Sequence, residues 1–136
     1  MRVIISKPAT AKIKEIETEG NERGGYFFYF INKDDCIVIT DLIEIENISD
    51  DPENKYKEKK FPFWLVMIKS LFKMRYGQWH THRSQTRIQR FKHRVQGKVY
   101  NENSLSGSDA AILFEKRKVY EYFRIMILTK KGITVY

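Results

Sequence analysis

Two apolar runs separated by a short polar turn constrain the fold of this chain most strongly. The first run, GGYFFYFI, covers residues 24–31, and the second, CIVITDLIEIEN, covers residues 36–47 and is rich in β-branched residues. Asn-Lys-Asp-Asp at 32–35 separates them, and these residue types favour turns. Such a pair of runs predicts a β-hairpin whose first strand is buried.

Further strands are predicted near both ends of the chain and after its middle. They cover residues 2–6, 76–82, 119–129 and 133–136. The last two form a hairpin that turns at Lys130-Lys131-Gly132. The polar, charged residues 49–60 (SDDPENKYKEKK) predict a mobile loop.

Helices are predicted between these strands. Ser6 can cap a first helix that carries Pro8 in its first turn and stops near Gly20. Residues 61–75, FPFWLVMIKSLFKMR, are apolar nearly all round and predict a core helix. A last helix is predicted over residues 109–117, capped by Ser106 or Ser108. Interleaved hairpins and helices predict an α+β class, or α/β with a mixed sheet.

Length and composition predict one globular domain over residues 1–136. The hydrophobic content is 42% and the aromatic content 14%, which argue against disorder. No apolar run approaches the roughly 18 residues that span a bilayer, and no signal peptide is evident, so we expect no membrane partner. The single cysteine, Cys36, is expected to be buried on a strand, and its isolation suits a reducing cytoplasm.

Charge is divided unevenly along the chain. Residues 1–60 carry 10 Lys/Arg and 13 Asp/Glu, a net of −3, whereas residues 61–136 carry 15 and 4, a net of +11. This asymmetry predicts an acidic partner for the second half of the chain: nucleic acid, an acidic protein surface or anionic lipid. The oligomeric state is not predicted by the sequence.

The segment YGQWHTH, residues 76–82, places His80 and His82 two residues apart on a predicted strand. Side chains at this spacing point to one face, so the two imidazoles could bind one metal ion. Asp109, at the start of a predicted helix, could supply a third ligand. Glu22, ahead of a buried strand, could act as a general base that is not itself a ligand.

These segments resemble the JAMM motif of the JAB/MPN metallopeptidases. Glu22-x-Gly24-Gly25, Trp79-His80-Thr81-His82 and Ser106-x-x-Asp109 follow the family's order, and they are most similar to the short prokaryotic JAB proteins. The resemblance covers nearly the whole chain. It implies a cytidine-deaminase-like sandwich in which helices flank a mixed β-sheet.

The resemblance also implies a role for each site residue. His80, His82 and Asp109 would bind one Zn²⁺ per chain. Glu22 would accept a proton from the attacking water and pass it to the leaving amine, and Ser106 would hydrogen-bond the oxyanion. The implied activity is hydrolysis of amide bonds, commonly at the extended tail of a ubiquitin-like modifier attached to lysine.

Residues 83–105 depart from the family pattern, which has proline after the second histidine and about seven residues before the serine. Here Arg83 follows, and the gap is 23 residues. Residues 83–100 carry six Lys/Arg and no acid, with apolar residues spaced as on one helix face. This basic insertion could be a solvated surface, or it could grip substrate through Arg83, Arg87 and Arg90.

Several of these residues have plainer structural interpretations. Ser106 could only cap a helix, Asp109 could only complement a helix dipole, and Glu22 could be a solvated turn residue. Trp79 could contact substrate or belong to the core. His93, inside the insertion, is expected to be exposed to solvent.

Two rival functions accompany the zinc hydrolase. One is a non-catalytic binding module of the same fold, whose basic face contacts nucleic acid; the few aromatic residues in the insertion speak against a stacking groove. The other is a structural subunit with a degenerate site, which the complete ligand set argues against.

Overall fold

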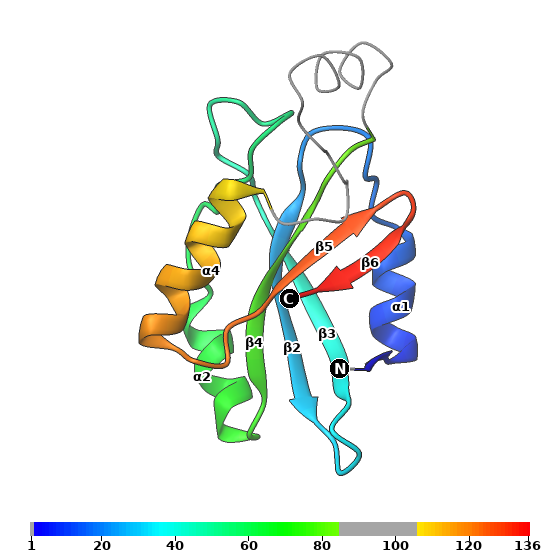
Figure 1. Cartoon of the computed structure of the whole chain (residues 1–136), viewed down its shortest axis with the longest axis vertical. Coiled ribbons are helices and arrows are strands. Elements are labelled where there is room, and N and C mark those ends of the chain that lie inside the picture. Colours follow the sequence, from blue (N-terminus) through cyan, green and yellow to red (C-terminus); the bar gives the residue numbers. More distant parts are fainter. Residues whose placement is uncertain (1, 85–105) are drawn as a thin grey trace.

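The computed structural model describes residues 2–84 and 106–136, and within them a six-stranded sheet forms the centre of the molecule (Figure 1). The strand order is β1-β3-β2-β4-β5-β6. The strands are β1 (Val3–Ile5), β2 (Gly24–Ile31), β3 (Ile37–Ile45), β4 (Arg75–Thr81), β5 (Ile125–Thr129) and β6 (Gly132–Val135).

The sheet is mixed. β1 runs parallel to β3 and β4 parallel to β5, whereas β2 pairs antiparallel with both of its neighbours, β3 and β4. β5 and β6 form the closing hairpin. With the helices that flank it, the described part of the chain has a mixed α+β fold, which confirms the predicted class.

Three helices in the described ranges cover the two faces of the sheet: α1 (Lys7–Lys14), α2 (Phe63–Leu71) and α4 (Gly107–Val119). α1 lies over one face, where Ala9 packs with Phe27 and Tyr29. α2 and α4 lie over the other, where Val66 and Leu113 join one cluster with strand residues. The helices stand on opposite sides of the strands in Figure 1.

β2 forms the centre of the sheet because its side chains are apolar on both faces. Tyr26 and Phe28 belong to the cluster under α2 and α4, and Phe27 and Tyr29 to the cluster under α1. All four are at most 1% exposed. Alternation along a strand turns neighbouring side chains to opposite faces, so the predicted buried strand is confirmed.

The first helix is shorter than predicted. Ser6 caps it and Pro8 lies in its first turn, as expected, but it ends at Lys14 rather than near Gly20. Acidic residues at 15, 17 and 19 follow it, and negative charge at a helix C-terminus opposes the helix dipole. The Glu17 carboxylate also accepts a bond from the Glu19 N–H, which stabilises a turn instead.

The prediction of a core helix over residues 61–75 is wrong. The helix forms over Phe63–Leu71, but Val66 is its only buried residue. From α2, only Val66 joins the buried cluster on this face of the sheet, with Leu65 partly buried against it. Most of its apolar side chains face solvent.

Other boundaries differ less. Residues 119–124 were predicted as strand, but α4 continues to Val119 and β5 starts at Ile125, after a turn in which Phe123 N–H bonds the Tyr120 carbonyl. Cys36 is buried, at 6% exposure, one residue before β3 begins. Within the described residues, no helix has the length and apolar character needed to cross a membrane.

Candidate metal centre

The two histidines lie at the end of β4. His80 is the second-last residue of this strand and His82 follows it, and they are 3% and 9% exposed. The main chain stays in register beyond the strand, because the His82 N–H donates to the Leu128 carbonyl at 3.0 Å. Both side chains therefore project from a fixed backbone.

Asp109 reaches them from the first turn of α4. Ser106 caps this helix: its Oγ accepts the Asp109 N–H at 3.1 Å, and its own N–H donates to Asp109 Oδ2 at 3.4 Å. This reciprocal pair is a capping box, with aspartate in the place of the usual glutamate. The cap holds the Asp109 carboxylate at the helix start, where it is 8% exposed.

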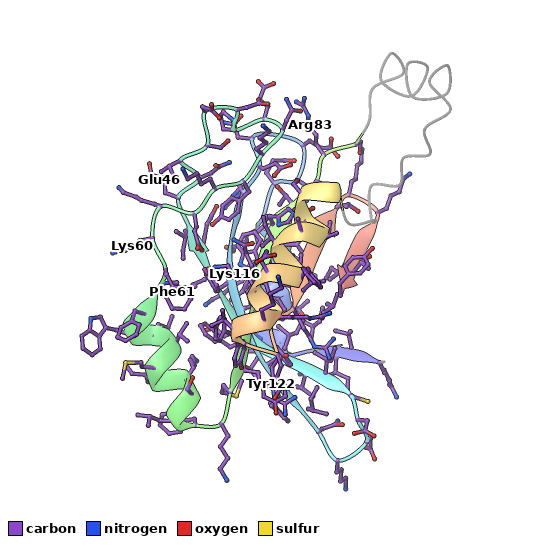
Figure 2. The ribbon with its side chains drawn as sticks, turned by 60° about the vertical axis from the view of Figure 1, so that its left-hand side comes forward. Glu46, Lys60, Phe61, Arg83, Lys116 and Tyr122 are labelled. Carbon is purple, nitrogen blue, oxygen red and sulfur yellow. The ribbon has the colours of Figure 1, made fainter. Side chains whose placement is uncertain are left out.

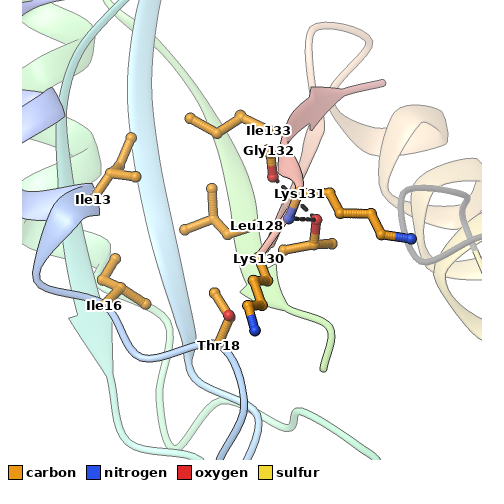
Figure 3. Close-up of a pocket in the computed structure, with 9 residues that line it drawn as sticks. Ile13, Ile16, Thr18, Leu128, Lys130, Lys131, Gly132 and Ile133 are labelled. Carbon is orange, nitrogen blue, oxygen red and sulfur yellow. Dashed lines mark hydrogen bonds between the residues drawn. The ribbon is translucent and has the colours of Figure 1, made fainter. Parts of the chain in front are cut away.

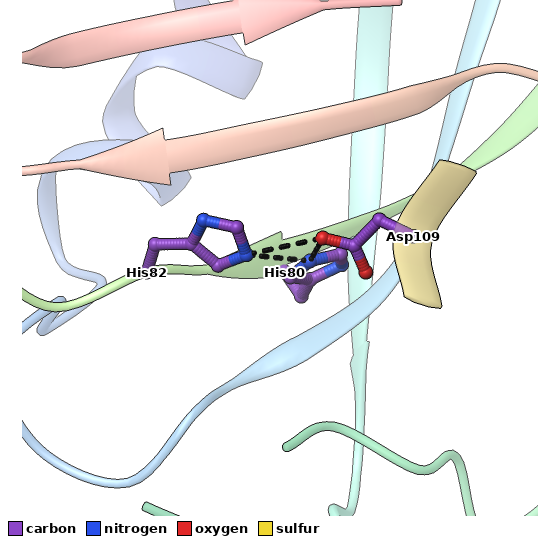
Figure 4. A group of neighbouring side chains, drawn as sticks. All are labelled: His80, His82 and Asp109. Carbon is purple, nitrogen blue, oxygen red and sulfur yellow. Dashed lines mark hydrogen bonds and ion pairs between the residues drawn. The ribbon is translucent and has the colours of Figure 1, made fainter. Parts of the chain in front are cut away.

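The three side chains converge on one point (Figure 4). The two Nε2 atoms lie 3.1 Å apart, and each lies 3.2 Å from Asp109 Oδ2. Tetrahedral zinc with bonds of about 2.0–2.2 Å separates neighbouring ligand atoms by roughly 3.3 Å. The described residues thus contain a buried group of two nitrogens and one oxygen that could bind a metal ion.

The electrostatics of Asp109 fit this arrangement. Burial alone would raise the pKa of its carboxyl group, but hydrogen bonds from His80 and His82 hold the pKa well below its usual range. The carboxylate is therefore ionised throughout the neutral range. A metal ligand must be in this form.

Glu22 lies beside the cluster, just ahead of β2. Gly24 stands opposite His80 in the β2–β4 ladder. One residue on, the Thr81 N–H donates to the Arg23 carbonyl, and the Arg23 N–H donates to Thr81 Oγ1. Because alternate residues share a face, Glu22 is on the same face as Gly24 and His80.

The placement of Glu22 raises its pKa. Burial raises it, and attraction by the two imidazoles lowers it by a smaller amount, so the pKa remains above its usual value of 4.5. Asp109 contributes a further rise. The Glu22 carboxylate therefore interacts electrostatically with all three members of the cluster. A raised pKa suits a group that must take up and release a proton.

Two residues that sequence reasoning missed hold this site in place. The Tyr56 ring stacks on the His80 ring, with centroids 6.3 Å apart and planes 12° apart. The Asn47 side-chain amide donates to the carbonyls of Glu22 and Lys55, each at 2.8 Å. The only sequence signal was one aromatic residue and one asparagine in or beside a charged segment.

Gly24 makes room for this stacking. A Cβ at this position would lie 2.7 Å from both Tyr56 Cζ and the Trp79 carbonyl oxygen. Nδ1 of His80 is buried, and no hydrogen-bond partner for it exists in the described part of the chain. The Tyr56 stack thus supplies the ring orientation that a second hydrogen bond supplies in many metal sites.

Ser106 is exposed and caps α4, as its structural interpretation predicts. Its Oγ accepts the Asp109 N–H, which leaves the hydroxyl proton to donate elsewhere; Ser108 Oγ lies 3.1 Å away. The cap and a contact with substrate are thus compatible. The oxyanion role itself stays a prediction.

The residues predicted to bind substrate have different outcomes. Trp79 is fully buried and its Nε1–H donates to the Ile43 carbonyl at 2.9 Å, which agrees with the core interpretation and leaves no surface for substrate. Arg83 is partly exposed and lies 3.5 Å from Glu53. Arg87, Arg90 and His93, with most of the basic insertion, lie outside the described residues.

A pocket of about 330 Å³ lies elsewhere, between the end of α1 and the β5–β6 turn (Figure 3). Ile13, Ile16 and Leu128 line it, and all three belong to the cluster on the α1 face of the sheet. His80 pairs with Ile127, whose side chain belongs to the opposite face. The pocket is therefore separate from the metal-ligating cluster.

The comparison of this sequence with known proteins gives no assignment. No protein-family model matches the chain, and no curated protein matches it. The function of this chain is therefore inferred from the residues at the C-terminal end of β4 and in the first turn of α4, and from the charged and aromatic groups around them.

Proposed function

We propose that this protein is a zinc-dependent hydrolase of amide bonds with a JAB/MPN-like fold. The observation that carries the proposal is the convergence of His80, His82 and Asp109 to within 3.2 Å of one another, beside a carboxylate with a raised pKa. The order of the motif parts along the chain adds to it. If His80, His82 and Asp109 formed only a structural hydrogen-bonded cluster, they would not need a carboxylate such as Glu22 beside them.

We propose zinc as the metal at these ligands. Two imidazole nitrogens and one carboxylate oxygen form a common ligand set for catalytic zinc, in which the fourth position is left open. Bound there, zinc would act as a Lewis acid and lower the pKa of water toward about 7. The residues around it would then direct the chemistry.

Glu22 would act as the general base and then the general acid. Its carboxylate, on the same face as His80, would accept the proton of the attacking water and deliver it to the leaving nitrogen. The main chain of Glu22 is fixed on both sides: its N–H donates to the Pro52 carbonyl at 2.7 Å, and its carbonyl accepts from Asn47. Ser106, at the helix start, would donate its hydroxyl proton to the oxyanion.

The proposed substrate is an extended protein tail joined through an amide bond, as in a ubiquitin-like modifier attached to lysine. This substrate class comes from the motif resemblance. An extended tail could enter the site from the ends of β2 and β4, since both strands are already paired on both sides. Cleavage of a small-molecule amide would use the same residues.

Metal analysis and activity assays on matched variants test the proposal. The wild type is expected to hold one zinc per chain and to cleave modifier–lysine fusions in a chelator-sensitive reaction. His82→Ala is expected to lose the zinc. Glu22→Gln is expected to keep it and lose activity, because the base is removed but the ligands remain.

Two outcomes would contradict the proposal. Stoichiometric zinc in His82→Ala would show the ligand assignment to be wrong. One bound zinc in the wild type, with no chelator-sensitive cleavage of protein or small-molecule amides, would refute the hydrolase while leaving the metal site intact.

The nucleic-acid module and the cytoplasmic location stay predictions. Five of the 15 Lys/Arg in the second half of the chain lie in the insertion, outside the described ranges, and Arg83 lies next to Glu53. Binding to DNA that falls steeply with added salt would favour the module over the hydrolase.

A further inference from the structure

α2 presents an apolar face to solvent. Trp64 is 74% exposed, Leu71 80% and Phe72 75%. Phe61, Phe63, Met67 and Ile68 are also exposed. The Phe61 ring also packs on Tyr26 and Tyr76, so the outward patch consists of the other six residues, all within 63–72. Single exposed apolar residues are ordinary, but six within ten residues form a patch of the kind that marks binding surfaces.

Lysine and arginine residues precede and follow this patch in the sequence. Residues 59–75 contain five Lys/Arg and no Asp or Glu. Lys59 and Lys60 precede the helix, Lys69 lies in its last turn, and Lys73 and Arg75 follow it. Lys60 lies ahead of α2 in Figure 2, on the outer side of the molecule.

Little acidic charge neutralises these basic residues. Lys59 pairs with Glu46 at 3.0 Å, through side chains that are both more than half exposed. Lys69 lies over the buried Phe28 ring and keeps its charge. Arg75 lies over the Tyr122 ring and pairs with Tyr29, whose side chain belongs to the α1 face, so its charge lies away from α2. The α2 surface is therefore positively charged, chiefly through Lys60, Lys69 and Lys73.

We propose that the α2 surface, residues 59–75, docks this protein onto a membrane that contains anionic lipid. Aromatic and aliphatic side chains on one side of a helix, with lysines around them, are the features of helices that lie in the membrane interface. Trp64 and Phe72 would enter the headgroup region, and the lysines would meet lipid phosphates. This surface replaces the expectation of no membrane partner, which rested on the lack of a spanning segment.

Charge favours lipid over a second copy of the chain. Two copies joined through α2 would bring two positively charged surfaces together, and like charges across an interface oppose association. An anionic bilayer offers the opposite charge over a wide, deformable surface. It also accommodates an exposed helix without requiring a matching groove.

Tryptophan fluorescence with lipid vesicles tests this docking directly. The chain has two tryptophans, and Trp79 is already fully buried, so a change in emission reports on Trp64. Full-length protein is mixed with vesicles of phosphatidylcholine, with and without phosphatidylserine. We expect a blue shift and co-sedimentation with the anionic vesicles, both weakened by salt.

Variants separate the contributions of charge and apolar area. Lys60→Glu with Lys73→Glu is expected to lower partitioning by at least about 25-fold, taking roughly fivefold for each lysine. Leu71→Ser with Phe72→Ser is expected to abolish co-sedimentation. Phe114→Ser is the matched control, because Phe114 is 65% exposed but lies on α4. Circular dichroism verifies that each variant folds.

Two results would overturn the docking proposal. Unshifted Trp64 emission and no co-sedimentation with anionic vesicles at low salt would remove it. A concentration-dependent dimer in sedimentation velocity, abolished by Leu71→Ser with Phe72→Ser, would assign the surface to a second copy instead. Neither result bears on zinc or on hydrolysis, because none of these residues belongs to the metal centre.

Discussion

The side-chain amide of Asn47 donates to the main-chain carbonyl of Glu22 at 2.8 Å, across 25 residues of sequence. The same side chain also donates to the Lys55 carbonyl, and its oxygen accepts the N–H groups of Ser49 and Lys57. Asn47 thus connects the segment after β3 to Glu22, two residues before β2 begins. The predicted loop at 49–60 is irregular but closely attached to the site.

Asn47→Ala should therefore loosen the segment and the proposed base together. We expect the free energy of unfolding to fall by about 2 kcal/mol, since each lost hydrogen bond contributes roughly 0.5–1.5 kcal/mol and water replaces part of them. Urea denaturation measures this loss. Asn54→Ala, in the same segment but with exposed bonds to Asp51, is the control and should change stability little. An equal loss in both variants would contradict the special role of Asn47.

Tyr56→Ala should weaken metal binding without removing a ligand. The ring stacked on His80 would be lost, and changes around metal ligands commonly cost about 10–100-fold in affinity. Zinc titration against a competing chelator measures the change. Tyr56→Phe keeps the ring and loses only the hydroxyl bond to the Ile45 carbonyl, so it should bind zinc nearly as well as wild type. Equal weakening in both variants would rule out stacking as the cause.

Zinc should stabilise the wild-type fold. Ligand at about 100 times its Kd adds roughly 2.7 kcal/mol, which corresponds to a rise in Tm of about 8–10 °C for a domain of this size. Differential scanning fluorimetry with and without zinc measures the shift. His82→Ala should show no shift, and a full shift in that variant would place the stabilising site elsewhere.

Gly25→Ala should prevent normal folding. A Cβ at Gly25 would lie 1.9 Å from the Ile43 carbonyl oxygen, a clash with main chain that no side-chain movement relieves. We expect a loss of about 4 kcal/mol or more, or insoluble protein. Gly107→Ala is the control, because nothing lies within 4 Å of its Cβ position. A soluble Gly25→Ala protein with wild-type stability would disprove the close approach of β2 and β3.

Stability should fall at alkaline pH because of buried tyrosines. Burial raises the pKa of Tyr120 to about 12 from its ordinary 10.0, and raises that of Tyr26, Tyr29, Tyr56 and Tyr76 as well. A raised folded-state pKa gives stability that is fully present below pH 10 and is lost as pH rises toward 12. Urea denaturation at a series of pH values measures the fall. Full tyrosinate absorbance near pH 10 in a still-folded protein would contradict it.

The members of the metal cluster could be predicted from sequence because local geometry places the two histidines on a strand and the aspartate at a helix start. Residues two apart on a strand share a face, which brings His80 and His82 together. A serine three residues before an aspartate forms a cap, which fixes Asp109 at a helix start. The distance between strand and helix, in contrast, depends on the parallel pairing of β4 with β5 and on the packing of α4, and neither has a local signal.

The exposure of α2 could not be predicted for a related reason. Residues 61–75 are apolar nearly all round, and this pattern predicts a buried helix whether or not the rest of the chain provides a surface that covers it. Tyr56 was missed because it lies in a segment of polar and charged residues, which gives no periodic signal. Its position over His80 depends on the absence of a side chain at Gly24, thirty-two residues earlier.

The capping box of α4 shares an atom with the metal-ligating cluster. The same Oδ2 of Asp109 that faces both imidazoles also accepts the Ser106 N–H, so an ion drawn to the cluster competes for the atom that caps the helix. We therefore expect metal binding at the cluster to change the first turn of α4. Amide exchange at Ala110, whose N–H bonds the Ser106 carbonyl at 2.9 Å, would follow metal occupancy from outside the site.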